Sequence, residues 1–438
     1  MIPLDDARAV VLAGCEALPP VRWPLRVADG CVTAESVTAV DAVPTFDNSA
    51  MDGYAVRTAD IAHAHADAPV TLTVIAGVFA GHPVDVTVGP GECVRIMTGA
   101  AVPAGVDAVV PVERTSTGEW SADGGAFTPE TLALETRAPV TRAPETRAPE
   151  TVVLTGPATV GDHIRRAGDD VSAGDVVVTE GTTLTPARLG VLAGVGRSSV
   201  VVHPRPRVGV FTTGDELVDP AWPLAPGQIR DTNRVVLLAM LARDGFEPVD
   251  LGRVADDEAA LRAAITAATR SCDALVTTGG VSMGQVDLVR VVLDRMGDMQ
   301  WMQVAIKPAK PFAFGVVTSG GRRIPVFGLP GNPVSSAVSY ELLARVGLCR
   351  IAGHGDDDLV RPAVTATVSG ELRRRRDGKV HFARVVATPA AGGGWTVTSA
   401  GSQGSHQLSV LAGSNALAVL PDGDGVPDGG TVDILVLD

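Results

Sequence analysis

Between Arg207 and Val346 the sequence alternates short apolar runs with segments of helical periodicity, and this alternation constrains the fold more than any other feature. Alternating strands and helices build an α/β domain with a largely parallel sheet. We therefore expect ligands to bind outside the carboxyl ends of its strands. The expected strands are Arg207–Thr212, Glu247–Leu251, Ala274–Thr278, Pro311–Val317 and Pro325–Phe327, and the expected helices are 232–242, Asp257–Thr269, Leu288–Met296 and Pro333–Val346.

The segments on either side of this domain have different hydrophobic patterns. Residues 1–43 begin with a helical pattern, with Ala7, Val10, Val11, Gly14 and Leu18 on one face, which Pro19-Pro20 ends. From about 70 to 113, short Val, Thr and Ile runs cut by Gly and Pro predict a small antiparallel β-domain or barrel. From about 355 onward the pattern is all-β, with a hairpin turn predicted at Asp377-Gly378. The expected C-terminal strands are Val364–Val368, His381–Val386, Trp395–Thr398, Ala416–Leu420 and Val432–Leu437.

Residues 135–149 consist of three tandem five-residue units, ETRAP, VTRAP and ETRAP. A period of five matches neither a helix nor a strand. Proline in every unit blocks a helix and lacks the backbone N–H group that would donate a hydrogen bond in a β-sheet. We expect an extended, solvated loop, with partner binding as the less favoured alternative.

Composition excludes several classes of protein. The net charge is −14, which argues against a nucleic-acid binder, and a hydrophobic content of 45% argues against global disorder. The five cysteines are scattered, without a C-x-x-C pair, so neither a disulfide framework nor a zinc-cysteine site is expected. No secretion signal is recognisable at the start, and no apolar run reaches the roughly 20 residues that span a bilayer. We expect a soluble cytoplasmic protein that acts without membrane or nucleic acid.

Three polar, glycine-bearing loops follow predicted strands of the α/β domain. They are Thr212–Glu216, Thr277–Ser282 and Gly328–Pro333, the last leading into a helix. Exposed amides and a helix N-terminus make such loops cradles for anions. Because all three are expected at one edge of the sheet, they predict a common binding site.

Carboxylates lie close to these loops in the sequence. Hard oxygen ligands beside a phosphate cradle suggest Mg²⁺. Helix capping is the alternative for Asp256, Asp257 and Asp287, because each precedes a predicted helix, and capping and metal binding can coexist. The candidate carboxylates are Asp215, Glu216, Asp256, Asp257 and Asp287.

Basic and histidine motifs offer further candidates. In Lys307-Pro308-Ala309-Lys310-Pro311 two prolines stiffen a stretch that holds two lysines three residues apart, a suitable site for a compact anion. The run Arg373–Arg376 is interpreted as a solvated hairpin flank, with an anion-attracting surface as the alternative. His63-x-His65 is interpreted as an exposed loop, with metal binding as the alternative.

Taken together, the motifs resemble the molybdopterin molybdenumtransferase family of the gephyrin E-domain type. They occur in order from position 47 to 409. The matching stretches are DNSAMDGYAVR (47–57), RIMTGA (95–100), IRRAGDDVSAG (164–174), TTGDEL (212–217), DTNR (231–234), TTGGVSMGQVD (277–287), IKPAKP (306–311), GLPGNPVSS (328–336) and GSQGSHQLS (401–409).

The resemblance implies a multidomain α/β plus β fold in an elongated, dimeric subunit. A small domain would comprise 1–43 and 155–183, and a β-domain would be inserted at 44–154. An α/β molybdopterin-binding domain with a parallel-rich sheet would follow at 184–354, and a C-terminal β-barrel at 355–438.

The implied reaction is the last step of molybdenum cofactor synthesis, in which adenylylated molybdopterin and molybdate yield the cofactor with Mg²⁺-dependent release of AMP. The resemblance further implies a homodimer, with molybdopterin adenylyltransferase and apo-molybdoenzymes as partners. It assigns catalysis to Asp52, Thr98, Glu216, Asp256, Asp287, Lys307 and Lys310, and Mg²⁺ binding to Glu216, Asp256 and Asp287. It assigns substrate binding to Thr213, Gly214, Asp215, Gly279, Gly280, Ser282, Pro311, Gly331, Asn332, Pro333, Ser335, Arg384 and Ser405. Lys307, Lys310, Arg384 and Ser405 would hold molybdate, and Asp52 and Thr98 would reach the other subunit.

The sequence departs from the family pattern at three places. Ala309 replaces a usual glycine, His163 stands where Asn is common, and the repeats at 135–149 are not a family feature. Two other functions remain open: a molybdopterin-binding carrier or scaffold without catalysis, and a molybdopterin adenylyltransferase. The retained Asp287, Lys307 and Lys310 favour the enzyme over the scaffold, and the additional domains argue against the adenylyltransferase.

Overall fold

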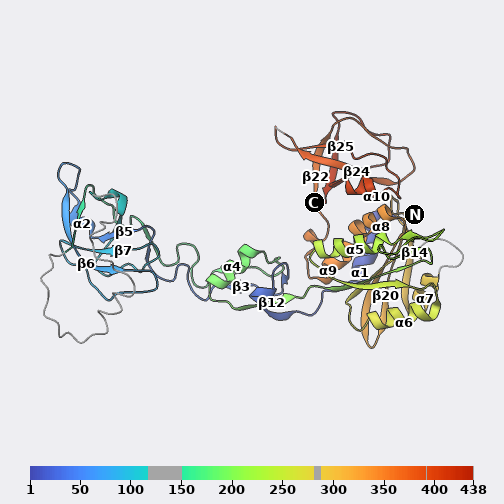
Figure 1. Ribbon diagram of the computed structural model, residues 1–438, viewed down its shortest axis with the longest axis horizontal. Coiled ribbons are helices and arrows are strands. Elements are labelled where there is room, and N and C mark those ends of the chain that lie inside the picture. The colour runs from blue at the N-terminus through green and yellow to red at the C-terminus, as the bar shows by residue number, and fades with distance from the viewer. Residues whose placement is uncertain (117–149, 281–287, 391, 438) are drawn as a thin grey trace. The chain divides into compact units, whose positions relative to one another are not determined.

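The computed structural model describes residues 1–116, 150–280, 288–390 and 392–437, which form two compact units (Figure 1). Unit 1 comprises Met1–Glu35, Thr179–Pro186 and Ser199–Asp438, and unit 2 comprises Ser36–Val178 and Ala187–Ser198. The repeats at 135–149 lie outside the described residues, and the four domain boundaries stay predictions. No helix among the described residues is long and apolar enough to cross a bilayer.

A six-stranded sheet forms the centre of unit 1. Four neighbouring strands are parallel and two antiparallel strands extend one side, as the alternating sequence predicts. The sheet order is β16 (Glu247–Val254), β13 (Arg207–Thr213), β17 (Ala274–Thr278), β21 (Arg322–Leu329), β20 (Pro311–Ser319) and β18 (Gly297–Gln303). Strand β18 is absent from the predicted elements.

Helices cover both faces of this sheet. Successive strand residues point to opposite sides, and in the central strands the residues on both sides are apolar, so each face packs against helices. Val210, Val276 and Phe327 belong to one buried core, and their neighbours Phe211, Leu275 and Val326 belong to another. The first core is covered by α1 (Leu4–Ala13), α5 (Thr232–Arg243), α8 (Pro333–Ser339), the π-helical turn η3 (Tyr340–Ala344) and α9 (Arg345–Ile351), and the second by α6 (Glu258–Ala268) and α7 (Leu288–Met296) (Figure 1).

The C-terminal strands close into a five-stranded barrel, which confirms the predicted β-barrel. A sixth, two-residue strand, β19 (Ile306–Lys307), comes from the α/β segment and pairs in parallel with β24. The order around the barrel is β24 (Val380–Pro389), β25 (Trp395–Ser399), β22 (Ala363–Val368), β28 (Thr431–Val436), β26 (Ala416–Leu420) and back to β24.

Two predictions for the barrel are wrong. The strand before Asp377-Gly378, β23 (Leu372–Arg373), pairs with β27 (Gly425–Val426) rather than with β24, so the turn does not close a hairpin. The arginine run is not uniformly solvated either. The Arg374 side chain is fully buried, because it donates hydrogen bonds to the carbonyls of Lys379, Leu420 and Pro421.

Unit 2 contains a five-stranded sheet that is mixed rather than antiparallel, because β6 and β7 run parallel. This differs from the predicted antiparallel domain and is a consequence of the long connection between these strands. The sheet order is β8 (Ala108–Pro111), β5 (Gly53–Val56), β7 (Glu92–Ile96), β6 (Val70–Val78) and β9 (Thr151–Leu154).

Short elements complete both units. In unit 2 these are α2 (Thr58–Ile61), η2 (Val112–Arg114), α4 (Pro186–Gly194, whose first residue belongs to unit 1) and the pairs β3 (Val37–Thr38) with β11 (Val176–Val178) and β4 (Asn48–Ser49) with β10 (Ile164–Arg165). In unit 1 they are η1 (Leu25–Val27), η4 (Asp356–Asp358), α10 (Leu408–Ala412), the sheet β1 (Val21–Pro24), β12 (Ser199–His203), β2 (Val32–Thr33), and the pair β14 (Leu217–Val218) with β15 (Ile229–Arg230).

Candidate active site

The three glycine loops meet at the carboxyl ends of β13, β17 and β21. A Cβ atom added to Gly279 would lie 2.9 Å from the carbonyl oxygen of Thr213, and one added to Gly331 would lie 3.9 Å from the Cα of Gly279. Gly279 has a φ of 88°, a left-handed conformation that glycine adopts readily. The loops therefore approach one another closely, at the carboxyl ends of the strands, where α/β folds bind their ligands.

The amide of Asn233, on the first turn of α5, joins two of these loops. Its Nδ2 donates to Thr278 Oγ1 at 2.9 Å and to the Gly331 carbonyl oxygen at 2.7 Å. Thr278 Oγ1 in turn donates to the carbonyl oxygen of Pro330 at 3.0 Å. Asn233 belongs to the DTNR motif and is not among the predicted site residues.

The candidate carboxylates differ in their surroundings. Glu216 folds back over its own loop, since a Cβ atom added to Gly214 would lie 2.6 Å from Glu216 Oε2. Asp257 caps α6 by accepting from the Ala260 amide at 2.8 Å, which confirms the capping alternative. Asp215 and Asp256 are exposed, and Ser282 and Asp287 lie outside the described residues.

No group of three or more His, Cys, Asp or Glu side chains in the described ranges is arranged to hold a metal ion. That statement covers His63 and His65, and it leaves out Asp287. The Mg²⁺ ligands therefore stay a prediction.

The lysine segment is shared between the α/β strands and the barrel. Lys307 pairs with His381 in register on β24, and the Ala305 carbonyl oxygen accepts from the Val380 amide at 2.9 Å. Both Lys307 and Lys310 are exposed. They are two of only three lysines in the chain, the third being Lys379, so a chain that otherwise uses arginine places lysine twice here. The rarity of lysine elsewhere in the chain is a signal, visible in the sequence alone, for this segment.

The barrel contributes Arg384 and Ser405, which lie close together. Arg384 is 1% exposed, and its Nη2 donates to the carbonyl oxygens of Gly404 and Ser402 at 3.2 and 3.4 Å. No carboxylate contacts it among the described residues, and its buried Nε has no partner there. Burial lowers the pKa of Arg384. Gln403, which no prediction named, fixes the strand by exchanging two amide hydrogen bonds with the Arg384 backbone.

The Ser405 loop touches the first turn of α8. The Val334 amide donates to the Ser405 carbonyl oxygen at 3.1 Å, so the barrel loop lies beside Asn332, Pro333 and the buried Ser335. The glycine loop after β21 and the arginine of the barrel are thereby brought to the same region of unit 1.

Asp52 and Thr98 form a separate pair in unit 2. Asp52 Oδ1 accepts from the Thr98 amide at 2.7 Å and from Thr98 Oγ1 at 2.8 Å, and both residues are exposed. The structure thus brings these two predicted residues together.

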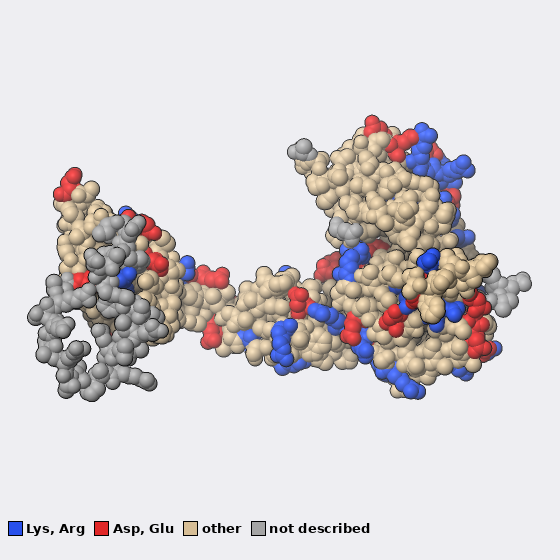
Figure 2. Space-filling model, viewed as in Figure 1, with Lys and Arg blue, Asp and Glu red and all other residues tan. Residues whose placement is uncertain are grey.

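Basic side chains also gather at an edge of the barrel (Figure 2). In the arginine run, Arg373 contacts Glu371, and Arg376 pairs with Asp424 at 2.8 Å. These local partners favour a solvated surface over an anion site.

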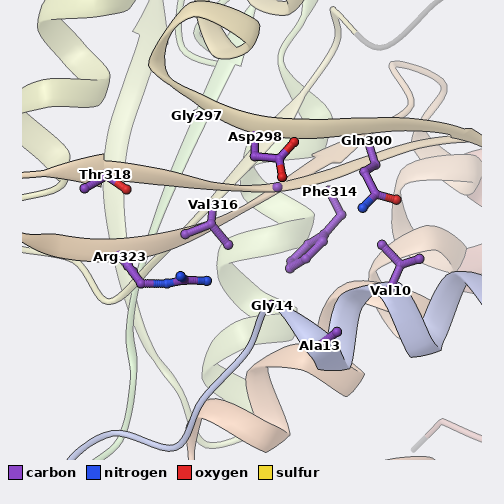
Figure 3. Close-up of a pocket in the computed structure, with 11 residues that line it drawn as sticks. Val10, Ala13, Gly14, Gly297, Asp298, Gln300, Phe314, Val316, Thr318 and Arg323 are labelled. Carbon is purple, nitrogen blue, oxygen red and sulfur yellow. The ribbon is translucent and has the colours of Figure 1, made fainter.

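A cavity of about 330 Å³ lies between α1 and strands β18 and β20 (Figure 3). Phe314 and Val316 line it together with the polar side chains of Asp298 and Arg323. Because Arg323 is at the amino end of β21, this cavity lies away from the carboxyl edge of the parallel strands. It contains none of the predicted site residues.

The backbone at Ala309 gives a first testable prediction. Ala309 is 2% exposed and has a φ of 74°. A β-branched residue is strained there and overfills the core, so Ala309→Val should lower the free energy of unfolding by about 1–3 kcal/mol. Ala309→Gly should change it by less than about 1 kcal/mol, because relief of the left-handed strain offsets the lost methyl group and the greater chain entropy. Urea unfolding measures both, with Ala363→Val at an exposed strand position as the control. Equal losses of unfolding free energy in Ala309→Val and Ala363→Val would contradict the assignment of Ala309 to a buried, left-handed position.

Comparison with known families covers most of the chain. Residues 2–196 match the MoeA N-terminal region (domain I and II), residues 209–348 a probable molybdopterin binding domain, and residues 370–437 the MoeA C-terminal region (domain IV).

Full-length relatives agree with these matches. The chain is 36% identical to the molybdopterin molybdenumtransferase of Haemophilus influenzae, over 99% of this chain and 98% of that protein. It is 37% identical to molybdopterin molybdenumtransferase 2 of Mycobacterium tuberculosis, over 96% of each chain. Among solved structures, the molybdopterin biosynthesis moeA protein of Pyrococcus horikoshii OT3 matches with a TM-score of 0.73 and 26% identity, over 100% of both chains.

Proposed function

This chain belongs to the molybdopterin molybdenumtransferase family, and on that premise we propose that it inserts molybdenum from molybdate into adenylylated molybdopterin and releases AMP. The relatives that cover its full length carry the transferase name. The observation that carries the proposal is the meeting of an anion-cradling loop with a buried arginine: the Val334 amide at the start of α8 contacts the Ser405 loop, which holds Arg384.

We assign the glycine loops to the pterin and pyrophosphate. Backbone amides next to Gly214, Gly279 and Gly331 can approach phosphate oxygens closely because no Cβ atom intervenes. Thr213, Asp215, Gly280, Ser282, Asn332, Pro333 and Ser335 would complete this half of the site.

Mg²⁺ fits the oxygen donors at this edge, since exposed carboxylates suit a hard cation. We propose that Glu216, Asp256 and Asp287 hold it. When bound, Mg²⁺ neutralises charge on the pyrophosphate. The fold-back of Glu216 over Gly214 supports this, because it places a carboxylate beside a loop proposed to cradle phosphate.

We assign Lys307, Lys310, Pro311, Arg384 and Ser405 to the molybdate oxyanion. A lysine ammonium is a compact charge with three hydrogen-bond donors, and an arginine guanidinium can donate two parallel hydrogen bonds to one oxyanion. Both groups can therefore bind a tetrahedral oxyanion such as molybdate. Asp52 and Thr98, in unit 2, are proposed to reach the α/β domain of a second subunit in a homodimer.

The proposal is tested by measuring AMP release from adenylylated molybdopterin in the presence of Mg²⁺ and molybdate. Wild-type protein should release AMP in a molybdate-dependent manner. A protein that binds the pterin without releasing AMP would be a carrier or scaffold, and the transferase proposal would be wrong.

The same assay tests the role of Lys307. A charge-assisted hydrogen bond contributes about 1.5–3 kcal/mol, so Lys307→Ala should raise the half-saturating molybdate concentration roughly tenfold to hundredfold. High molybdate should restore much of the rate. The exposed Arg373→Ala serves as the control and should behave like wild type. An unchanged half-saturating concentration in Lys307→Ala would move this lysine from the oxyanion to the phosphates.

A further inference from the structure

The side chain of Asn233, which belongs to neither loop, contacts both the second and the third glycine loop. Its two amide hydrogens reach Thr278 Oγ1 and the Gly331 carbonyl oxygen, which belong to segments 53 residues apart in sequence. The Gly331 carbonyl oxygen can only accept, so the amide nitrogen must face it. The orientation of the Asn233 side chain is thereby determined by its surroundings.

The residues around Asn233 fix its position at the start of α5. Asp231 caps the helix by accepting from the Arg234 amide at 3.1 Å, and it also accepts from Thr212 Oγ1 at 2.6 Å. Arg234 binds three carboxylates, those of Asp231, Asp250 and Asp219. The first turn of α5 is therefore tied to the end of β13, and the Asn233 amide extends from a rigid support toward the other two loops.

The ladder between β17 and β21 ends at the pair Thr278 with Leu329, and beyond it the loops are joined by individual hydrogen bonds. Between the loops, the Gly279 amide donates to the Leu329 carbonyl oxygen at 3.3 Å, which is long for a backbone hydrogen bond. Asn233 and Thr278 provide the shorter bonds, at 2.7, 2.9 and 3.0 Å. Glycine-rich segments have high conformational freedom, so side-chain ties of this kind are needed to hold the loop amides in place.

We propose that Asn233 is a positioning residue for the adenylylated pterin: through Thr278 and Gly331 it holds the β17 and β21 loops at the separation that binds the pterin and its pyrophosphate. This inference rests on the proposed function. Asn233 acts through the loops, and it leaves the oxyanion half of the site, formed by Lys307 and Arg384, unaffected.

The test compares binding of the two substrates. Asn233→Ala removes both donated hydrogen bonds, so equilibrium binding of adenylylated molybdopterin, measured by pterin fluorescence, should weaken about tenfold to hundredfold. The half-saturating molybdate concentration in the AMP-release assay should stay at the wild-type value. Asn415→Ala is the matched control, because Asn415 also makes two amide hydrogen bonds, both to Ala387 in the barrel. It should bind the pterin as wild type does.

A second pair of variants guards against misfolding. Thr278→Ser keeps the hydroxyl group and should bind the pterin normally, whereas Thr278→Val loses the bonds to Asn233 and to Pro330 and should resemble Asn233→Ala. Normal pterin binding by Asn233→Ala, or by Thr278→Val if Asn233→Ala does not fold, would overturn the inference, as would an equal loss of pterin and molybdate affinity. If wild-type protein binds the pterin but releases no AMP, the proposed function fails, and the binding comparison still decides the role of Asn233.

Discussion

Replacing Glu341 by alanine should lower the free energy of unfolding of unit 1 by about 1.5–3 kcal/mol, because it removes charge-assisted hydrogen bonds to two partly exposed arginines. Glu341 is 5% exposed, on the turn η3. Its carboxylate accepts from Arg361 at 2.5 Å and from Arg243 at 3.2 Å, and it lies 3.9 Å from Arg345.

A second carboxylate, that of Asp244, completes this cluster. It accepts from Arg361 at 2.8 Å and from the Tyr340 hydroxyl at 3.0 Å. Burial, and after it the charge of Asp244, raises the pKa of Tyr340 well above its ordinary value, so the phenol keeps its proton and donates. Arg361 lies just before the first barrel strand, and the cluster therefore stabilises the junction between the α/β sheet and the barrel.

Urea unfolding of the purified protein measures the effect. Glu341→Gln keeps an acceptor for Arg361 and should lose less stability than Glu341→Ala. The control is Glu247→Ala, which removes an exposed partner of Arg207 and should cost less than about 1 kcal/mol. A Glu341→Ala protein as stable as the Glu247→Ala control would show that the cluster contributes little.

Replacing Arg384 by methionine should have opposite effects on activity and stability. If Arg384 binds molybdate, removing a buried counter-charge costs about 3–5 kcal/mol of oxyanion affinity, which raises the half-saturating molybdate concentration by at least about a hundredfold. Within the described ranges the buried guanidinium makes two carbonyl contacts, both from Nη2, at 3.2 and 3.4 Å. An apolar side chain of similar length avoids the desolvation of that charge, so the free variant should be at least as stable as wild type.

Thermal unfolding without ligands and AMP release against molybdate give the two readouts. Arg384→Lys keeps the charge but not the planar guanidinium. Its half-saturating molybdate concentration should lie between those of Arg384→Met and wild type. A methionine variant that loses several kcal/mol of stability and keeps its molybdate dependence would make Arg384 a structural residue of the barrel.

Much of the fold could be predicted from local pattern. Strands β13 and β17 are apolar runs that end in threonines, β21 contains the apolar run Pro325–Phe327, and the glycine loops after these strands do meet at one edge. The edge strand β18 was not predicted because it lacks an apolar run: glycine and aspartate begin it, and Gln300 and Gln303 interrupt its apolar residues. Helix α1 ends at Ala13, earlier than the apolar face to Leu18 suggests, because Gly14 follows.

Features that depend on distant partners could not be predicted in this way. Pairing of β23 with β27 and burial of Arg374 are set by residues near position 420, which no local window includes. The tie made by Asn233 likewise needs two loops that only the folded sheet brings together. Departures from the family pattern were more informative than expected. Ala309 and His163, noted for differing from the usual glycine and asparagine, are the two non-glycine residues with positive φ in the described segments.

The pairing of β19 with β24 has a mechanical consequence. Lys307 precedes the α/β strand β20 in the chain, yet its backbone is part of the barrel ladder, paired with the strand β24 that carries Arg384. A displacement of the barrel relative to the sheet would either break the pairing at Ile306 and Lys307 or carry Lys307 along. While the pairing holds, Lys307 and Arg384, two of the three cations proposed for molybdate, move together relative to the glycine loops.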